Sequence, residues 1–288
     1  MSNQNWRAPA CALAVAAAAA CALPALAAES EQDVRAEMQK LPWQVGPGTG
    51  EVGSHSKLDI PDGARLLPES SGSRFLELTG NLPEPGDTVL IHKDWWATLS
   101  FDDSGYVKDD EKLDPDALLA AMRKNEESSN EERRKRGMDT LSTDGWIVLP
   151  HYDPATKYLE YGVRLHSSAS SQPVVNYTMR LLSRHGYETV TLVTRPETLT
   201  QDVQDLHQVL GGFKFNAGET YGEFRPGDHV AEFGLGALVL GGAAAAAVKA
   251  GWFKGLLVAL AAGWKLVAAA AVAVVAGIKR FFGRATGR

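Results

Sequence analysis

The chain has only two cysteines among its 288 residues, Cys11 and Cys21, and both lie near its start. They fall within an apolar run over residues 8–23 that ends in small residues, Ala25-Leu26-Ala27, as secretory signals do. We therefore predict a signal peptide over residues 1–27 that is removed in the mature protein. A mature chain would then lack cysteine, which excludes a thiol nucleophile, a disulfide framework and a zinc–cysteine site.

Two other interpretations of the N-terminus stay open. The apolar run could remain attached as a membrane anchor, although it is short and rich in alanine. Cys21 could instead carry a lipid, although leucine is missing three positions before it.

The chain also lacks the motifs of common enzymes and metal sites. Its seven histidines have no H-E-x-x-H spacing, and there is no G-x-S-x-G elbow, P-loop or dinucleotide-binding glycine motif behind a strand. A calcium loop starting at Asp102 or Asp103 would place Gly105 and Asp114 at the wrong positions. The sequence therefore predicts no metal, no cofactor and no identifiable catalytic residue. The formal net charge of −6 argues against a nucleic-acid partner.

A long apolar region is present at the other end of the chain, over residues 231–278. Residues 255–278 are rich in large aliphatic side chains and predict a transmembrane helix, whereas the glycine- and alanine-rich residues 231–254 predict a membrane-proximal helical segment. The basic residues of 279–288 would then form a cytoplasmic tail, in agreement with the positive-inside rule. A second span within 231–248 is the alternative.

Between these ends the sequence predicts a linker or loose N-terminal arm over residues 28–53, with a helix-like stretch at 31–40, and an exported α+β domain over residues 54–230. A helix is expected at 70–79 and another at 198–210. Asp114-Pro115 predicts a helix start with Asp114 as the N-cap, and a second charged helix should end at Gly137.

Alternating apolar residues predict an antiparallel meander packed with a few helices. In the strand at 95–101, Trp95 should be buried and Trp96 exposed. In the later strands the expected inward residues are Leu159, Tyr161, Val163, Leu165, Val175, Tyr177, Met179 and Leu181. Glu160, Arg164, Asn176, Thr178 and Arg180 are expected on the opposite, polar face.

Two groups of candidate binding residues follow. Arg164, Asn176 and Arg180 on the polar face could bind an anionic group or a partner's carboxylates. The acidic stretch at 105–119 contributes Tyr106, Asp109 and Asp110, and it reads mainly as a solvated turn before a helix cap. A carboxylate pair for hydrolysis is the alternative interpretation of this stretch.

Several blocks in order carry a resemblance to a known family. They are "GYVKDD" at 105–110, "DALL" at 116–119, "GWIVLPHYD" at 145–153, "VNYTMRLLSRHG" at 175–186 and "GETYGEF" at 218–224, followed by "AEFGL" at 231–235. Together they resemble the domain of unknown function 2167 family, which consists of predicted membrane-anchored bacterial proteins. The resemblance implies an envelope-facing domain followed by a C-terminal membrane segment, and it implies no reaction. Ser183 departs from the family's more usual glycine at this turn.

From these observations we expect a non-enzymatic protein- or ligand-binding domain held by its C-terminal helix at the outer face of the inner membrane. Most of the chain would be periplasmic, and its partners would be the lipid bilayer and an envelope protein. The alternatives are a membrane-anchored hydrolase that uses carboxylates of the region Asp102 to Glu111, and a sensor of small ions or anions.

Overall fold

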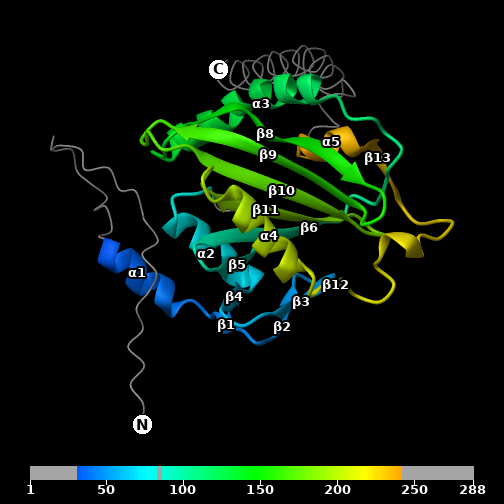
Figure 1. The fold of residues 1–288 in the computed structure, drawn as a ribbon, viewed down its shortest axis with the longest axis horizontal. Coiled ribbons are helices and arrows are strands. Elements are labelled where there is room, and N and C mark those ends of the chain that lie inside the picture. Colours follow the sequence, from blue (N-terminus) through cyan, green and yellow to red (C-terminus); the bar gives the residue numbers. More distant parts are fainter. Residues whose placement is uncertain (1–30, 83–85, 242–288) are drawn as a thin grey trace, which may run out of the picture. The chain divides into compact units, whose positions relative to one another are not determined.

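The computed structural model describes residues 31–82 and 86–241 (Figure 1). The expected signal peptide at 1–27, the expected membrane helix at 255–278 and the basic tail at 279–288 lie outside these residues. Within the two described ranges, no helix combines the length and the apolar character that a membrane crossing requires.

An eight-stranded antiparallel sheet forms the centre of the fold, in the order β1-β4-β5-β6-β11-β10-β9-β8. Its strands, in chain order, are β1 (Gln44–Val45), β4 (Ala64–Leu67), β5 (Thr88–His92), β6 (Trp95–Asp102), β8 (Leu141–Asp153), β9 (Tyr158–Ser167), β10 (Val174–Leu182) and β11 (Tyr187–Thr194). Strands β8 to β11 are neighbours both in the chain and in the sheet, so the predicted meander is confirmed.

Two small sheets and a few helices complete the described part. The small sheets contain β2 (Gly48–Val52), β3 (Ser56–Ile60) and β12 (Phe213–Phe215), and the parallel pair β7 (Tyr106–Lys108) and β13 (Val230–Gly234). The helices are α1 (Glu31–Lys40), α2 (Glu69–Leu78), α3 (Pro115–Lys135), α4 (Leu199–Leu210) and α5 (Leu235–Val239), with a 3₁₀ turn η1 (Tyr221–Glu223). The mixed α+β class with a large antiparallel sheet is therefore confirmed.

Part of the stretch expected as a linker is folded. Residues 44–45 form β1 at one edge of the large sheet, and residues 48–52 form β2 against β3. Val52 is buried in the core. Gly50 explains why a glycine-rich run folds here, because an added Cβ would lie 2.5 Å from the side chains of Gln44 and Leu66. These glycines allow close approach between the two sheets, where the sequence pattern indicated only flexibility.

Helix α3 begins as predicted and continues further than predicted. The Asp114 carboxylate accepts a hydrogen bond from the Ala117 backbone N–H at 3.1 Å, and Pro115 occupies the first helical position. The two expected helices are one, because residues 123–128 contain neither proline nor glycine to interrupt it. The helix ends before Gly137, whose φ of 68° lies in the left-handed region.

The register of β9 against β10 places their apolar residues on opposite faces. Tyr161 pairs with Thr178, and Gly162 pairs with Tyr177. Directly opposed residues share a face, so Tyr161 and Tyr177 point to different sides of the sheet. The expectation of one apolar and one polar face was therefore wrong, and the meander is covered on both sides.

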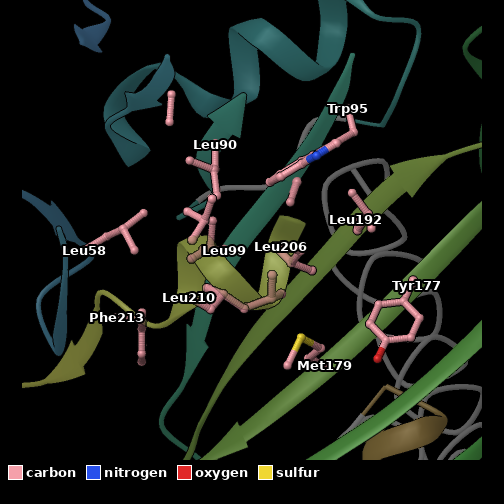
Figure 2. Packing of buried hydrophobic residues seen from close by; sticks show 14 of the residues in the cluster. Leu58, Leu90, Trp95, Leu99, Tyr177, Met179, Leu192, Leu206, Leu210 and Phe213 are labelled. Carbon is pink, nitrogen blue, oxygen red and sulfur yellow. The ribbon is translucent and has the colours of Figure 1, made fainter. Parts of the chain in front are cut away.

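The first face packs under α4 and the small sheet of β2, β3 and β12. Figure 2 shows this cluster, in which Leu206 and Leu210 of α4 lie next to Leu99 of β6. Glu160, expected to point to solvent, is on this face and is buried, where it accepts a hydrogen bond from the Tyr177 hydroxyl. The helix predicted at 198–210 is confirmed as α4, and it covers this face of the sheet.

The second face carries two separate apolar clusters. One contains Leu159, Tyr161, Leu182 and Tyr187 and packs against residues of α3, α5 and η1. The other contains Leu67 and Val89 and packs against α2. Trp96, expected to be exposed, is half-buried in the second of these clusters, with its ring centroid 5.2 Å from that of Phe75.

Candidate functional site

The carboxylates of the acidic stretch serve separate structural contacts. Asp102 accepts hydrogen bonds from the Tyr187 hydroxyl at 2.9 Å and from the Ser104 backbone N–H at 3.0 Å. Glu111 accepts one from the Gly236 backbone N–H at 3.0 Å. Asp110 is exposed. With Asp114 used as the helix cap, this stretch fixes β7, α3 and α5 in place.

Asp109 lies in a cluster of aromatic and charged side chains from distant parts of the chain. Its Oδ2 accepts hydrogen bonds from the Tyr152 hydroxyl at 2.7 Å and from Lys157 Nζ at 2.9 Å. Burial opposes the charge on Asp109, but these two hydrogen bonds and the Lys157 charge outweigh burial and lower its pKa. The carboxylate is therefore ionised and neutralised by its neighbours.

Tyr106 belongs to the same cluster. Its ring stacks on Tyr221 and also lies against Phe224, each at a centroid distance of 4.4 Å. Lys157 Nζ lies 5.1 Å from the centroid of Tyr221. The sequence placed Tyr106 and Asp109 among the candidate binding residues, and the structure brings both of them together with residues that sequence reasoning did not select. The stack joins the turn at 221–224 to β7 and to the β8–β9 hairpin.

An ion pair of Arg184 anchors the segment that contains Tyr221 and Phe224. Nε and Nη2 of Arg184 donate to both oxygens of Asp228 at 2.7 Å, a bidentate pair in which both side chains are largely buried. Hydrogen bonding to Arg184 lowers the pKa of Asp228 far below its usual range. The turn at Ser183 and Arg184 is thus an anchoring point for residues 216–230.

The three polar residues predicted on one face of the meander do not come together. Arg164 pairs with Val175 and is exposed on the face that carries Tyr177. Asn176 pairs with Val163 and Arg180 pairs with Leu159, so both lie on the opposite face. A site that combines Arg164 with Asn176 and Arg180 is therefore excluded, whereas Asn176 and Arg180 remain together.

Asn176 and Arg180 belong to a larger group that we call the polar strip. It occupies the second face between the two apolar clusters and consists of small hydroxyl side chains, one amide and one guanidinium. In register across β10, β11 and β6, its members are Arg180–Thr189–Ser100, Thr178–Thr191–Thr98 and Asn176. Apart from buried Thr178, these residues are half-buried.

The hydroxyl groups of the polar strip follow an alternating pattern in the sequence. Threonine and serine alternate with apolar residues in "WATLSF" at 96–101 and in "TVTLV" at 189–193. Alternation predicted the buried faces of these strands, but only pairing in register joins their hydroxyl groups into one surface.

Arg180 is the only charged member of the polar strip. One Nη donates to the Thr189 hydroxyl, and the guanidinium carbon lies 5.4 Å from the Tyr187 ring centroid. Its Nε is buried without a hydrogen-bond partner. Asp102, the acid in the neighbouring cross-strand row, is engaged by Tyr187 and Ser104. Within the described ranges, Arg180 thus forms no ion pair.

The strip can donate and accept hydrogen bonds, and it carries one positive charge. Threonine and serine hydroxyls and the Asn176 amide supply both donors and acceptors, and Arg180 supplies donors only. Among the described residues, no group of three or more metal-ligating side chains is arranged to hold an ion. The arrangement is suited to binding a polar group.

Comparison with known proteins gave one family and a weak structural likeness. Among solved structures, the cyanobacterial PsbP (CyanoP) from Synechocystis sp. PCC 6803 is 11% identical, with a TM-score of 0.34, covering 60% of this chain and 98% of that chain. No curated protein matches the chain. The family model described as a protein of unknown function (DUF2167) matches residues 44–275, which include nearly all of the described fold. The chain belongs to the DUF2167 family.

Proposed function

We propose that the chain is a non-enzymatic binding domain that recognises a protein or a ligand through the polar strip. The observation that carries this proposal is the set of half-buried hydroxyl, amide and guanidinium groups between two apolar clusters on one sheet face. Polar groups in such a position bind well when a ligand supplies hydrogen-bond partners and excludes water.

A hydrolase that uses the acidic stretch has less support. General acid catalysis by a carboxyl group needs a raised pKa, whereas the pKa of Asp109 is lowered by its neighbours. Asp102 and Glu111 are each engaged in contacts that hold the fold together. The remaining alternative, a sensor of small ions or anions, is compatible with the polar strip, because Arg180 is half-buried there without an acidic partner.

The proposal includes a location. A signal peptide at residues 1–27 would export the domain, and a helix at 255–278 would hold it at the outer face of the inner membrane with the basic tail inside. The support comes from the sequence: a cleavable apolar leader, a second apolar region and four cations after residue 278. The bilayer and an envelope protein would be the partners.

Site-specific photocrosslinking in intact membranes tests the binding face. A photoreactive amino acid at Ser100, within the strip, should give a defined adduct on irradiation. The same amino acid at Glu51, an exposed residue of β2, is the matched control. Intact mass of the purified chain then distinguishes a protein adduct from a small-molecule adduct. Equal adducts at both positions, or an adduct at Glu51 alone, would contradict the proposed binding face.

Reporter fusions test the location separately. A reporter active only in the periplasm should work when joined after Arg225 and should fail when joined after Arg288, with the reverse pattern for a cytoplasmic reporter. Export of both junctions would instead contradict the single-anchor arrangement. A second span within 231–248 conflicts with the described fold, in which residues 230–239 form β13 and α5 and pack against the sheet.

A further inference from the structure

The side chains of the polar strip favour one class of ligand. We propose that Arg180 and the hydroxyl groups around it form a binding site for a small oxyanion, the phosphate or carboxylate group of a ligand. This inference rests on the proposed binding function and narrows it to one ligand chemistry.

The first argument is the unmatched charge. Arg180 is half-buried in the middle of a sheet face, and no carboxylate lies within ion-pair distance of it among the described residues. Removing a cation from water without a counter-ion is unfavourable, and an arginine in this position is usually paired. Arg184 of the same chain shows the usual arrangement, because it is paired with Asp228 through two hydrogen bonds. Arg180 has no such acidic partner among the described residues.

The second argument is the free edge of the guanidinium. One Nη is used by Thr189, whereas Nε is buried with no partner. A buried N–H without an acceptor costs about 1–3 kcal/mol. Nε and the second Nη form the side of the guanidinium that receives two oxygens of a carboxylate or phosphate in the bidentate arrangement. An oxyanion at the second Nη would therefore match the charge, and it would also satisfy Nε once the side chains that cover this atom move aside.

The third argument is the chemistry of the surrounding surface. On β11, Thr189 lies opposite Arg180 and Thr191 lies diagonal to it, and Ser100 follows Thr189 in the same cross-strand row. Thr178 is the neighbour of Arg180 on the same face of β10, and Leu159 of β9 lies on its other side. Each hydroxyl can rotate to donate to an anionic oxygen. Arg180 is therefore the charged donor of the strip, and the Asp102 carboxylate lies on this face in the next cross-strand row. The oxygens of Asp102 accept from Tyr187 and Ser104.

The test uses the full-length chain purified in detergent and titrated with sodium phosphate or sodium acetate at constant ionic strength. Isothermal titration calorimetry should give saturable binding with one site. Arg180→Lys keeps the positive charge but removes the fork, so affinity should fall by about tenfold or more. Thr191→Val removes one hydroxyl at constant shape, and binding should weaken by a smaller factor.

Arg164→Gln is the matched control, because Arg164 is an arginine of the same meander on the opposite face. Its affinity should equal that of the unmodified chain. Circular dichroism and the melting temperature of each variant establish that it is folded. Stronger binding of phosphate than of acetate would assign a phosphorylated ligand, and the reverse would assign a carboxylate.

Two results would overturn the inference. One is the absence of saturable binding of both anions to the unmodified chain, and the other is equal affinity in the Arg180→Lys and Arg164→Gln variants. Neither result would remove the proposed binding function, which depends on adducts at Ser100. If instead Ser100 gives no adduct while phosphate binds through Arg180, the site is an anion site without a protein partner.

Discussion

Glu188 offers the sharpest test of how the core of this fold is built. It lies on the face of β11 that packs under α4, opposite Phe101 and Leu181, and its side chain is fully buried. Ser56 Oγ lies 3.3 Å from Glu188 Oε2 and 3.0 Å from the Val52 carbonyl oxygen. A protonated Glu188 can donate from Oε2 to Ser56 while Ser56 donates to Val52, whereas a carboxylate would compete with the Val52 carbonyl for the single Ser56 hydrogen. Oε1 is buried without a partner in both states, and this costs more when the group is charged.

Burial raises the pKa of Glu188 from its ordinary value of 4.5 to about 8. Between these two values the unfolded chain has lost this proton and the folded chain keeps it, so the folded state binds more protons. Stability must then fall as pH rises, by about 1.4 kcal/mol per pH unit inside this window. At pH 7 the cost relative to a neutral residue is about 3 kcal/mol, and it levels off above pH 8.

The measurement is urea unfolding of the full-length chain in detergent at several pH values from 5 to 8, followed by tryptophan fluorescence. Glu188→Gln keeps the shape and can still donate to Ser56, but it cannot ionise. Its free energy of unfolding should exceed that of the unmodified chain by about 3 kcal/mol at pH 7 and by less than about 1 kcal/mol at pH 5. Glu197→Gln, at an exposed position, should change neither value. Parallel pH profiles for Glu188→Gln and the unmodified chain would refute the assignment of a neutral buried acid.

Two further predictions concern stability and one concerns processing. Asp114→Ala should destabilise the domain by about 0.5–2 kcal/mol because Ala117 N–H loses its cap, and urea unfolding measures this. Gly186→Ala should cost at least about 2 kcal/mol, because its Cβ would lie 1.7 Å from the Asp102 carbonyl oxygen, whereas Gly222→Ala, with open space around it, should cost little. N-terminal sequencing of the mature protein should begin near Ala28, and retention of Met1 would contradict cleavage.

Local features of the fold could be predicted because local physics determines them. The Asp114 cap depends on residues three positions apart, and the strands from β9 to β11 depend on alternation within each segment. The predicted burial of Trp95 follows from the same alternation and is confirmed, and Ala97 and Leu99 are buried on the same face.

The relation between segments could not be predicted in the same way. Alternation in β9 and in β10 is correct for each strand, but a shift of one residue between them reverses which side chains share a face. That shift separates Arg164 from Arg180. Long-range contacts could not be predicted either. Tyr106 and Tyr221 stack on each other although 115 positions separate them in the sequence. The candidate site was therefore predicted in two of its residues, Asn176 and Arg180, and its hydroxyl groups were found only through register.

The edge strand β8 gives a last prediction, because α3 protects it in an uncommon way. Asn130 Nδ2 donates to the Leu141 carbonyl at 2.7 Å, and its Oδ1 accepts from the Leu141 N–H at 2.9 Å, so one side chain reproduces both hydrogen bonds of a neighbouring strand. Glu126 accepts from the Thr143 N–H at 2.7 Å next to it. Unpaired strand edges are templates for association with other chains.

Asn130→Ala should therefore destabilise the domain by about 1–3 kcal/mol, because Asn130 is buried and both backbone groups of Leu141 lose their partners. It should also increase self-association, which light scattering at increasing protein concentration measures. Asn130→Asp keeps the acceptor for the Leu141 N–H and loses the donor. Its stability and its self-association should therefore lie between those of the unmodified chain and of Asn130→Ala. Glu131→Ala is the control on the exposed side of α3, where a surface pair with Lys135 contributes about 0.5 kcal/mol or less. If Asn130→Ala and Glu131→Ala unfold at the same urea concentration and scatter equally, α3 does not protect the edge, and the irregular register of β8 must keep it from pairing instead.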